Sequence, residues 1–198
     1  MRRNAARKGR ELKQETTLRL VAAIAAVAAL AVIVGGGGAA AASTASKAKP
    51  ATIDMARDGK DVFFEGAKTV QAGATLKIKN LTNPKQVGPH TFSLVRKQER
   101  PKTRNQIKAC AKKLKGICGA IVKWHDVNVQ TGEIGENPVE VGKNGWNLEG
   151  NLKRKGDSWV AERKNESFKR EVTAKPGTTL HFICAVHPEM QGKIKVTD

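Results

Sequence analysis

The chain has 198 residues, 39% of them hydrophobic and 27% charged, which allows one domain of ordinary size with additional segments. Its formal net charge is +18, of which seven basic and two acidic residues before Leu20 supply +5. Only 4% of the residues are aromatic and no basic block accompanies a helix-turn-helix or zinc-finger pattern, which argues against nucleic-acid binding. The remaining +13 is consistent with a basic solvated surface, or with attraction to acidic partners or anionic envelope polymers.

The first 34 residues have the layout of a secretory signal. A basic lead precedes 15 uncharged apolar residues, Leu20 to Val34, and small residues follow. A helix of that length reaches about 22 Å, short of a hydrocarbon core of about 30 Å, unless it continues through the Gly/Ala tract. A cleaved signal peptide and a membrane anchor at residues 18–38 both remain open. Either one exports the domain to the cell envelope, the periplasm or the outside.

The domain organisation follows from the changes in composition. Residues 35–52 are expected to form an Ala/Gly/Ser linker. Residues 53–198 are expected to form the folded domain, with an insertion at about 97–156.

Residues 53–96 have the pattern of β-strands, with short apolar runs separated by Gly, Asn-Pro and Gly-Pro turns. His90 shares one face of its run with Phe92 and Leu94, while Thr91 and Ser93 lie on the other. His90 therefore points towards the core from the end of a strand, where a metal ligand of a β-sandwich should lie. If His90 is considered without the other candidate ligands, the alternative is a histidine that is hydrogen-bonded within the core.

Asn80 ends a similar run, in which Leu76 and Ile78 share its inward face. Two roles are open for this side chain. It supports the metal-ligand loops by hydrogen bonds, or it opens the turn from Asn80 to Pro84.

The insertion begins with a helical pattern. Thr103 and Gln106 form a capping-box signature. An apolar stripe follows at helical spacing, and a glycine stop closes it. The members of the stripe are Ile107, Cys110, Ala111 and Leu114, and the stop is Gly116. Residues 128–156 are expected to form a long irregular loop.

Cys110 and Cys118 are candidates for a disulfide, because a chain that turns at Gly116 can bring them together in an exported domain. A second metal site that uses these cysteines and His125 is the less favoured alternative, since no C-x-x-C spacing supports it. A surface or structural role is expected for His125.

The last block contains Cys184, His187 and Met190 at the spacing C-x-x-H-x-x-M. A thiolate, an imidazole and a thioether are donors that suit copper, and two His, one Cys and a weak axial Met form a blue-copper set. Cys184 lies on the inward face at the end of its predicted strand, whereas His181 lies on the opposite face and is not expected to be a ligand.

These motifs resemble the cupredoxins, the plastocyanin and azurin group of blue copper proteins. The G-P-H at 88–90 and the C-x-x-H-P-x-M-x-G-K turn, which is similar to that of amicyanin, carry the resemblance over about 59–96 and 157–198. It implies an all-β, Greek-key β-sandwich with one type 1 copper held by His90, Cys184, His187 and Met190. It also implies that His187 is the exposed ligand that passes the electron. This sequence departs from the cupredoxin pattern in its insertion.

The sequence therefore predicts an electron carrier with a redox protein partner, acidic on charge grounds, and no enzymatic activity. A monomer is expected. The alternative is a copper-binding or copper-delivery protein, or a structural envelope module, that uses the same fold without electron transfer.

Overall fold

The computed structural model describes residues 48–198, so the predicted signal or anchor and most of the predicted linker lie outside the described residues. Within residues 48–198 no helix is both long and apolar enough to span a membrane.

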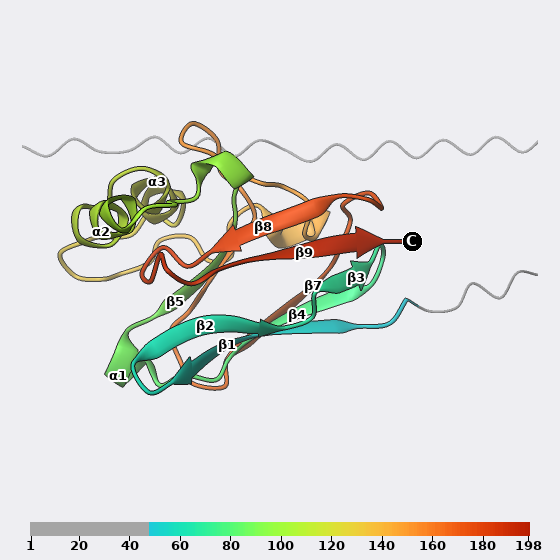
Figure 1. The fold of residues 1–198 in the computed structure, drawn as a ribbon, viewed down its shortest axis with the longest axis horizontal. Coiled ribbons are helices and arrows are strands. Elements are labelled where there is room, and N and C mark those ends of the chain that lie inside the picture. Colours follow the sequence, from blue (N-terminus) through green and yellow to red (C-terminus); the bar gives the residue numbers. More distant parts are fainter. Residues whose placement is uncertain (1–47) are drawn as a thin grey trace, which may run out of the picture. The chain divides into compact units, whose positions relative to one another are not determined.

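Two β-sheets form the framework (Figure 1). The first sheet has the order β2-β1-β4-β7 and the second has the order β3-β9-β8-β5-β6. The strands are β1 (Ala51–Asp58), β2 (Asp61–Gly66), β3 (Thr69–Gln71), β4 (Thr75–Asn80), β5 (His90–Leu94), β6 (Ser158–Ala161), β7 (Ser167–Glu171), β8 (Thr179–Ile183) and β9 (Gln191–Thr197). The predicted all-β sandwich is confirmed.

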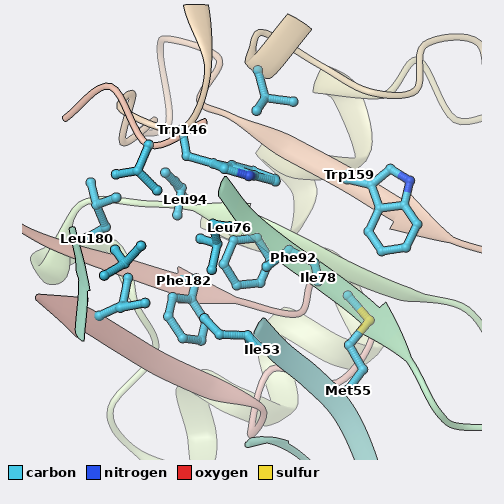
Figure 2. Close-up of a cluster of buried hydrophobic side chains, with 14 of the residues drawn as sticks. Ile53, Met55, Leu76, Ile78, Phe92, Leu94, Trp146, Trp159, Leu180 and Phe182 are labelled. Carbon is cyan, nitrogen blue, oxygen red and sulfur yellow. The ribbon is translucent and has the colours of Figure 1, made fainter. Parts of the chain in front are cut away.

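Alternating side chains of the two sheets build the core. In β4 the inward residues Leu76, Ile78 and Asn80 are buried, while the lysines between them are only half-buried. Aromatic rings then join the sheets: Phe64 of β2 packs edge-on against Phe182 of β8 with ring centroids 5.1 Å apart. Within the second sheet, Phe92 packs against Phe182 at 4.6 Å (Figure 2). This packing fixes the ends of β5 and β8, from which the metal-ligand candidates project.

Strand β1 begins earlier than the sequence pattern suggests. It includes Ala51 and Thr52, which are predicted to lie in the linker, and it pairs with β2 on one side and β4 on the other. The strand is therefore an inner member of its sheet, and its Ile53 and Met55 are buried in the core.

The insertion contains more helix than predicted. Its elements are a 3-10 helix (η1, Lys97–Glu99), α2 (Arg104–Lys113), α3 (Ile117–Trp124) and α4 (Val141–Asn144), and a short helix α1 (Pro84–Val87) precedes β5. The Thr103–Gln106 capping box is present at the start of α2. The helix ends at Lys113, before the predicted glycine stop, because Leu114 takes the left-handed conformation.

The predicted apolar stripe of α2 is only partly buried. Cys110 is the one fully buried residue of this helix, and Ala111 and Leu114 are exposed. Burial comes instead from α3, whose Ile117, Ile121 and Trp124 pack with Cys110 in a second apolar cluster. This cluster also contains residues at the end of β8, so the insertion lies beside the ligand-bearing end of the sandwich.

Candidate metal centre

Strand pairing brings the two halves of the candidate site together. Strands β5 and β8 are antiparallel neighbours, with Ser93 opposite Ile183. The first residue of β5, His90, therefore lies beside the residue that follows β8, Cys184, at one end of the sandwich.

The segment from Cys184 to Met190 is a tight turn closed by backbone hydrogen bonds. The Cys184 amide donates to the Met190 carbonyl over 3.0 Å, and the Met190 amide donates to the His187 carbonyl over 2.8 Å. Gly192 follows in β9, where a Cβ atom would lie 2.2 Å from the Phe182 ring. The turn is thus held at both ends by the packed sandwich.

Three donor atoms converge at this end. The Sγ atom of Cys184 lies 3.7 Å from Nδ1 of His90 and 3.8 Å from Nδ1 of His187. Metal–sulfur and metal–nitrogen bonds of about 2.3 and 2.0 Å, as in zinc sites, place two donors about 3.7 Å apart when the bonds are about 120° apart. The observed spacing therefore fits trigonal coordination of one metal ion.

The metal-free contacts leave hydrogen-bonding capacity unused. A thiol has one proton, so Cys184 can donate to only one of the two Nδ1 atoms, whereas a metal ion coordinates both. This unused capacity on the Nδ1 side of both rings favours a bound ion over a purely structural role for these side chains.

The burial of the four residues is unequal. His90, Cys184 and Met190 are buried, and His187 is only half-buried. His187 is therefore the member of the set through which the site reaches the surface.

Burial sets the protonation states of the donors. It lowers the pKa of His90 to about 4, with a further contribution from the nearby His187. It also lowers the pKa of His187, against the opposing charge of Glu189. Both imidazoles are thus neutral at neutral pH, which is the form that binds a metal.

The Cys184 thiol is also affected by burial, which raises its pKa although backbone amides oppose the shift. The Thr91 amide donates to Sγ over 3.3 Å and the His187 amide over 3.4 Å. These two N–H groups would stabilise the thiolate form of Cys184, which is the form that binds a metal cation.

Thr91 is the supporting residue that the sequence pattern does not reveal. Its hydroxyl oxygen accepts a hydrogen bond of 2.9 Å from the amide of Ala185, the residue after Cys184. Thr91 lies on the face opposite His90, and it is buried there because the insertion covers that face. Register could have indicated it, since Thr91 adjoins His90 on a strand that pairs with the cysteine strand.

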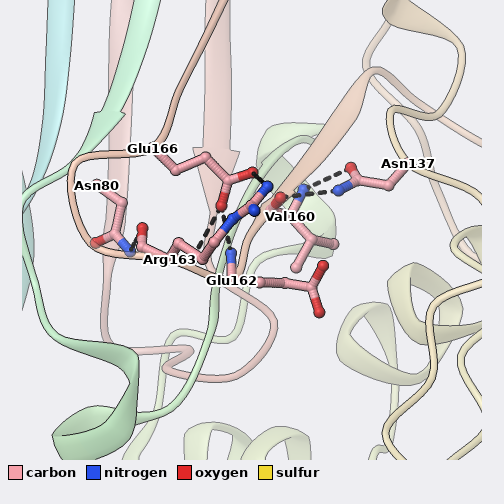
Figure 3. A network of polar contacts seen from close by, with 6 residues as sticks. All are labelled: Asn80, Asn137, Val160, Glu162, Arg163 and Glu166. Carbon is pink, nitrogen blue, oxygen red and sulfur yellow. Dashed lines mark hydrogen bonds and ion pairs between the residues drawn. The ribbon is translucent and has the colours of Figure 1, made fainter.

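The side chain of Asn80 is hydrogen-bonded to the turn that follows β4. Its side-chain oxygen accepts from the amide and the hydroxyl of Thr82. Its side-chain nitrogen donates to the Arg163 carbonyl (Figure 3). These bonds stabilise the turn after β4 and connect it to the loop before β7. Within residues 48–198, the side-chain hydrogen bonds of Asn80 go to Thr82 and Arg163 and not to the metal-ligand turn.

The other histidines and cysteines lie outside the site. His181 pairs with Glu149 through Nδ1 at 2.9 Å, in agreement with the expectation that it is not a ligand. Cys110 and Cys118 form a disulfide, which excludes the alternative metal site that would use both thiolates. His125 is buried and bound to protein groups on both ring nitrogens.

Comparisons with known proteins give only distant matches. No family model and no curated protein matches the chain. Among solved structures, dithionite-reduced auracyanin from Roseiflexus castenholzii is 17% identical, with 74% of this chain and 97% of that chain covered and a TM-score of 0.37. Auracyanin B is 13% identical, with 75% of this chain and 88% of that chain covered and a TM-score of 0.41.

A third structure, auracyanin A, is described as a "blue" copper protein from Chloroflexus aurantiacus. It is 20% identical over 75% of this chain and all of that chain, with a TM-score of 0.37. Because these sequence identities and TM-scores are low, the functional interpretation is based on the donor atoms of the present chain.

Those donors define a class of site. A two-sheet sandwich that carries two histidines, a cysteine and a methionine at one end has the ligand arrangement of the cupredoxins. The cluster of His90, Cys184, His187 and Met190 is able to bind one copper ion.

Proposed function

We propose that the chain is a type 1 copper protein that carries single electrons between redox partners in the cell envelope. The observation that carries the proposal is the pair of distances, 3.7 and 3.8 Å, between Cys184 Sγ and the two imidazole Nδ1 atoms. In this proposal His90, Cys184 and His187 are the strong ligands and Met190 is the weak axial ligand. Bound copper would supply a one-electron couple between Cu(II) and Cu(I).

The chain's own contribution is rigidity. The thiol of Cys184 receives two backbone N–H bonds, and His90 projects from a strand that is buried at every position. A donor set fixed by paired strands keeps one geometry in both oxidation states, which favours fast electron transfer. Four protein ligands also leave no open position for a substrate, which agrees with a carrier that is not an enzyme.

His187 is the proposed exit for the electron, because it is the half-buried ligand. Beside it, Val186 is 41% exposed and borders an apolar hollow of about 250 Å³. Pro89 on one side and Leu114 and Val122 of the insertion on the other also line the hollow. An apolar surface around a ligand lets a partner approach closely and exclude water.

The insertion gives this surface a strong positive charge. Residues 104–125 contain six basic residues and no acidic one. The five lysines among them, Lys108, Lys112, Lys113, Lys115 and Lys123, are all exposed. An acidic redox protein would be attracted to this end of the molecule, with an effect mainly on the association rate.

The proposed location follows from the N-terminal segment, which has the sequence of an export signal or anchor. The disulfide supports export as well, since such bonds persist in oxidising compartments.

The test is copper titration of the full chain. Added Cu(II) is expected to produce an intense visible copper–thiolate band and the electron paramagnetic resonance spectrum of a type 1 site. Cys184→Ser abolishes both signals, while the matched double variant Cys110→Ser/Cys118→Ser retains them. A colourless, weakly bound copper complex in the wild type would contradict the proposal.

Electron transfer is tested separately from copper binding. The loaded protein is expected to be reduced by ascorbate and reoxidised by ferricyanide over repeated cycles without loss of copper. Slow redox cycling combined with ready transfer of copper to an apo acceptor would support copper delivery instead.

A further inference from the structure

A line of buried polar side chains connects the insertion to the metal site. Starting from α3, His125 Nε2 lies 2.7 Å from Ser158 Oγ, which lies 2.7 Å from Ser93 Oγ. Ser93 Oγ is in turn 3.0 Å from Thr91 Oγ1, and Thr91 Oγ1 accepts from the Ala185 amide. We call these four side chains, His125, Ser158, Ser93 and Thr91, the His125–Thr91 network.

All four members are buried in an otherwise apolar region. His125, Ser158 and Ser93 are at most 1% exposed. An unpaired hydroxyl or imidazole at such a place destabilises the fold, so each member depends on its neighbours. Removal of one link therefore alters the next one along the line.

The outer end of the network fixes the ring of His125. Its Nδ1 lies 2.7 Å from the carbonyl oxygen of Glu136, which can only accept, so Nδ1 carries a proton. With the ring neutral, Nε2 is an acceptor and Ser158 donates to it. Since each hydroxyl has one proton, this choice sets the direction in which the hydroxyls of Ser158 and Ser93 point.

The inner end of the network touches the ligand turn at two atoms of Thr91. Its hydroxyl oxygen holds the Ala185 amide, and its own amide donates to Cys184 Sγ over 3.3 Å. Because Ser158 gives its proton to His125 Nε2, Ser93 has to donate to Ser158. Ser93 then has no proton left for Thr91, whereas without Nε2 Ser158 can donate to Ser93 and Ser93 can donate to Thr91. A change at His125 is thus transmitted to the residue next to the thiolate ligand.

We propose that His125 is a positioning residue for the metal site, acting through Ser158 and Ser93 on Thr91. This inference rests on the proposed copper function and extends it, because it gives the insertion a part in setting the reduction potential. Hydrogen bonds to the cysteine sulfur stabilise the reduced state, in which the sulfur is more negative. A loosened network is therefore expected to lower the potential.

Two substitutions at His125 separate the network from simple packing. In His125→Gln the side-chain amide reaches the position of Nε2 and keeps the contact with Ser158. In His125→Asn the amide reaches only the position of Nδ1, so it keeps the Glu136 contact and leaves Ser158 without its acceptor at Nε2. The potential is expected to stay near the wild-type value in His125→Gln and to fall in His125→Asn.

The links between the ends are tested by Ser93→Ala and by the double variant Ser93→Ala/His125→Asn. If the residues act in one line, the double variant shifts the potential no further than Ser93→Ala alone. Ile117→Ala is the matched control, since Ile117 is buried in the insertion's apolar cluster but lies at the opposite end of α3 from His125. It is expected to reduce stability without a change in potential.

A second readout needs no copper. In the metal-free full chain, the Ala185 amide is expected to exchange its hydrogen faster in His125→Asn and Ser93→Ala than in the wild type or Ile117→Ala. This result is informative even if the copper function fails, because it reports the hydrogen bond to Thr91 directly. Unchanged Ala185 exchange, or equal potentials in His125→Asn and the wild type, would overturn the inference while leaving the proposed function intact.

Discussion

The Thr91 amide nitrogen lies 3.3 Å from Cys184 Sγ, although 93 residues separate Thr91 from Cys184 in the chain. The contact exists because β5 and β8 are neighbours in one sheet and because Thr91 directly follows His90. One short strand segment thus supplies a metal-ligand candidate and, one residue later, a hydrogen-bond donor to the sulfur.

Thr91→Val tests the hydroxyl in this arrangement. The substitution preserves side-chain shape and the amide bond to sulfur but removes the acceptor for the Ala185 amide, which is then buried unpaired. We expect a loss of about 1–3 kcal/mol in the free energy of unfolding and a lower reduction potential. Thr91→Ser, which keeps the hydroxyl, is expected to stay close to the wild-type potential in voltammetry; equal potentials for the two variants would contradict this role.

Met190→Leu tests the axial ligand. The exchange nearly conserves volume at a buried position, so we expect the metal-free protein to lose less than about 1.5 kcal/mol of stability. Loss of the thioether donor disfavours Cu(II) relative to Cu(I), so the reduction potential is expected to rise. Met55→Leu, at a fully buried position in β1, is the matched control with an unchanged potential. A fall in the Met190→Leu potential would contradict the assignment.

Gly192→Ala tests the close packing behind the ligand turn. The new Cβ would meet two ring carbons of Phe182 at 2.2 and 2.4 Å, so either the ring or β9 has to move. We expect a loss of about 1–3 kcal/mol in urea unfolding. Gly142→Ala, whose Cβ would meet no atom within 4 Å, is the control and is expected to leave the unfolding midpoint unchanged. Equal midpoints for the two variants would show that the ring can move freely.

The disulfide is tested in the metal-free protein by Cys110→Ala/Cys118→Ala. Closing a nine-residue loop stabilises by about 2.5 kcal/mol in the chain-entropy model, so a loss of at least this size is expected. Denaturant unfolding with and without a reducing agent measures the effect, and the reductant should destabilise the wild type but not the variant. A wild type that is insensitive to the reductant would refute the prediction.

Asp157 predicts a pH dependence of stability. Its carboxylate accepts from the amides of Asn147 and Leu148, but burial dominates and raises the pKa from 3.8 to about 6. Because the folded state keeps this proton to a higher pH than the unfolded state, the contribution of Asp157 to stability falls as pH rises from about 4 to about 6.

The matched variant for this effect is Asp157→Asn, which keeps an oxygen acceptor and does not titrate. We expect its stability, measured by urea unfolding relative to the wild type, to improve as pH rises through that interval. A difference between the two proteins that is independent of pH would show that the pKa of Asp157 is not raised.

The sequence predicts the donors of the site better than their surroundings. Alternation placed His90 on the core-facing side of its strand, and the C-x-x-H-x-x-M spacing placed three donors in one turn. Alternation could not show that Thr91 and Ser93 are buried as well, since the side chains that cover them come from a distant insertion.

The insertion itself was the least predictable part. Helix α3 has the sequence ICGAIVKW, in which β-branched residues and tryptophan favour a strand. Packing against Cys110 and the end of β8 outweighs that local preference. His125, which follows this helix, was expected at the surface or in a structural role; it is buried and hydrogen-bonded to Glu136 and Ser158, which agrees with the second of these.

The disulfide also bears on the order in which the protein matures. Cu(II) oxidises free thiols, and a thiolate can attack a disulfide only if it reaches one of its sulfur atoms. Cys110 and Cys118 are bonded to each other, and Cys184 is the one remaining free cysteine, with its side chain fully buried. A chain that pairs its first two cysteines and folds before it meets copper thus offers the incoming ion one thiol to bind and no second thiol with which to form the wrong bond.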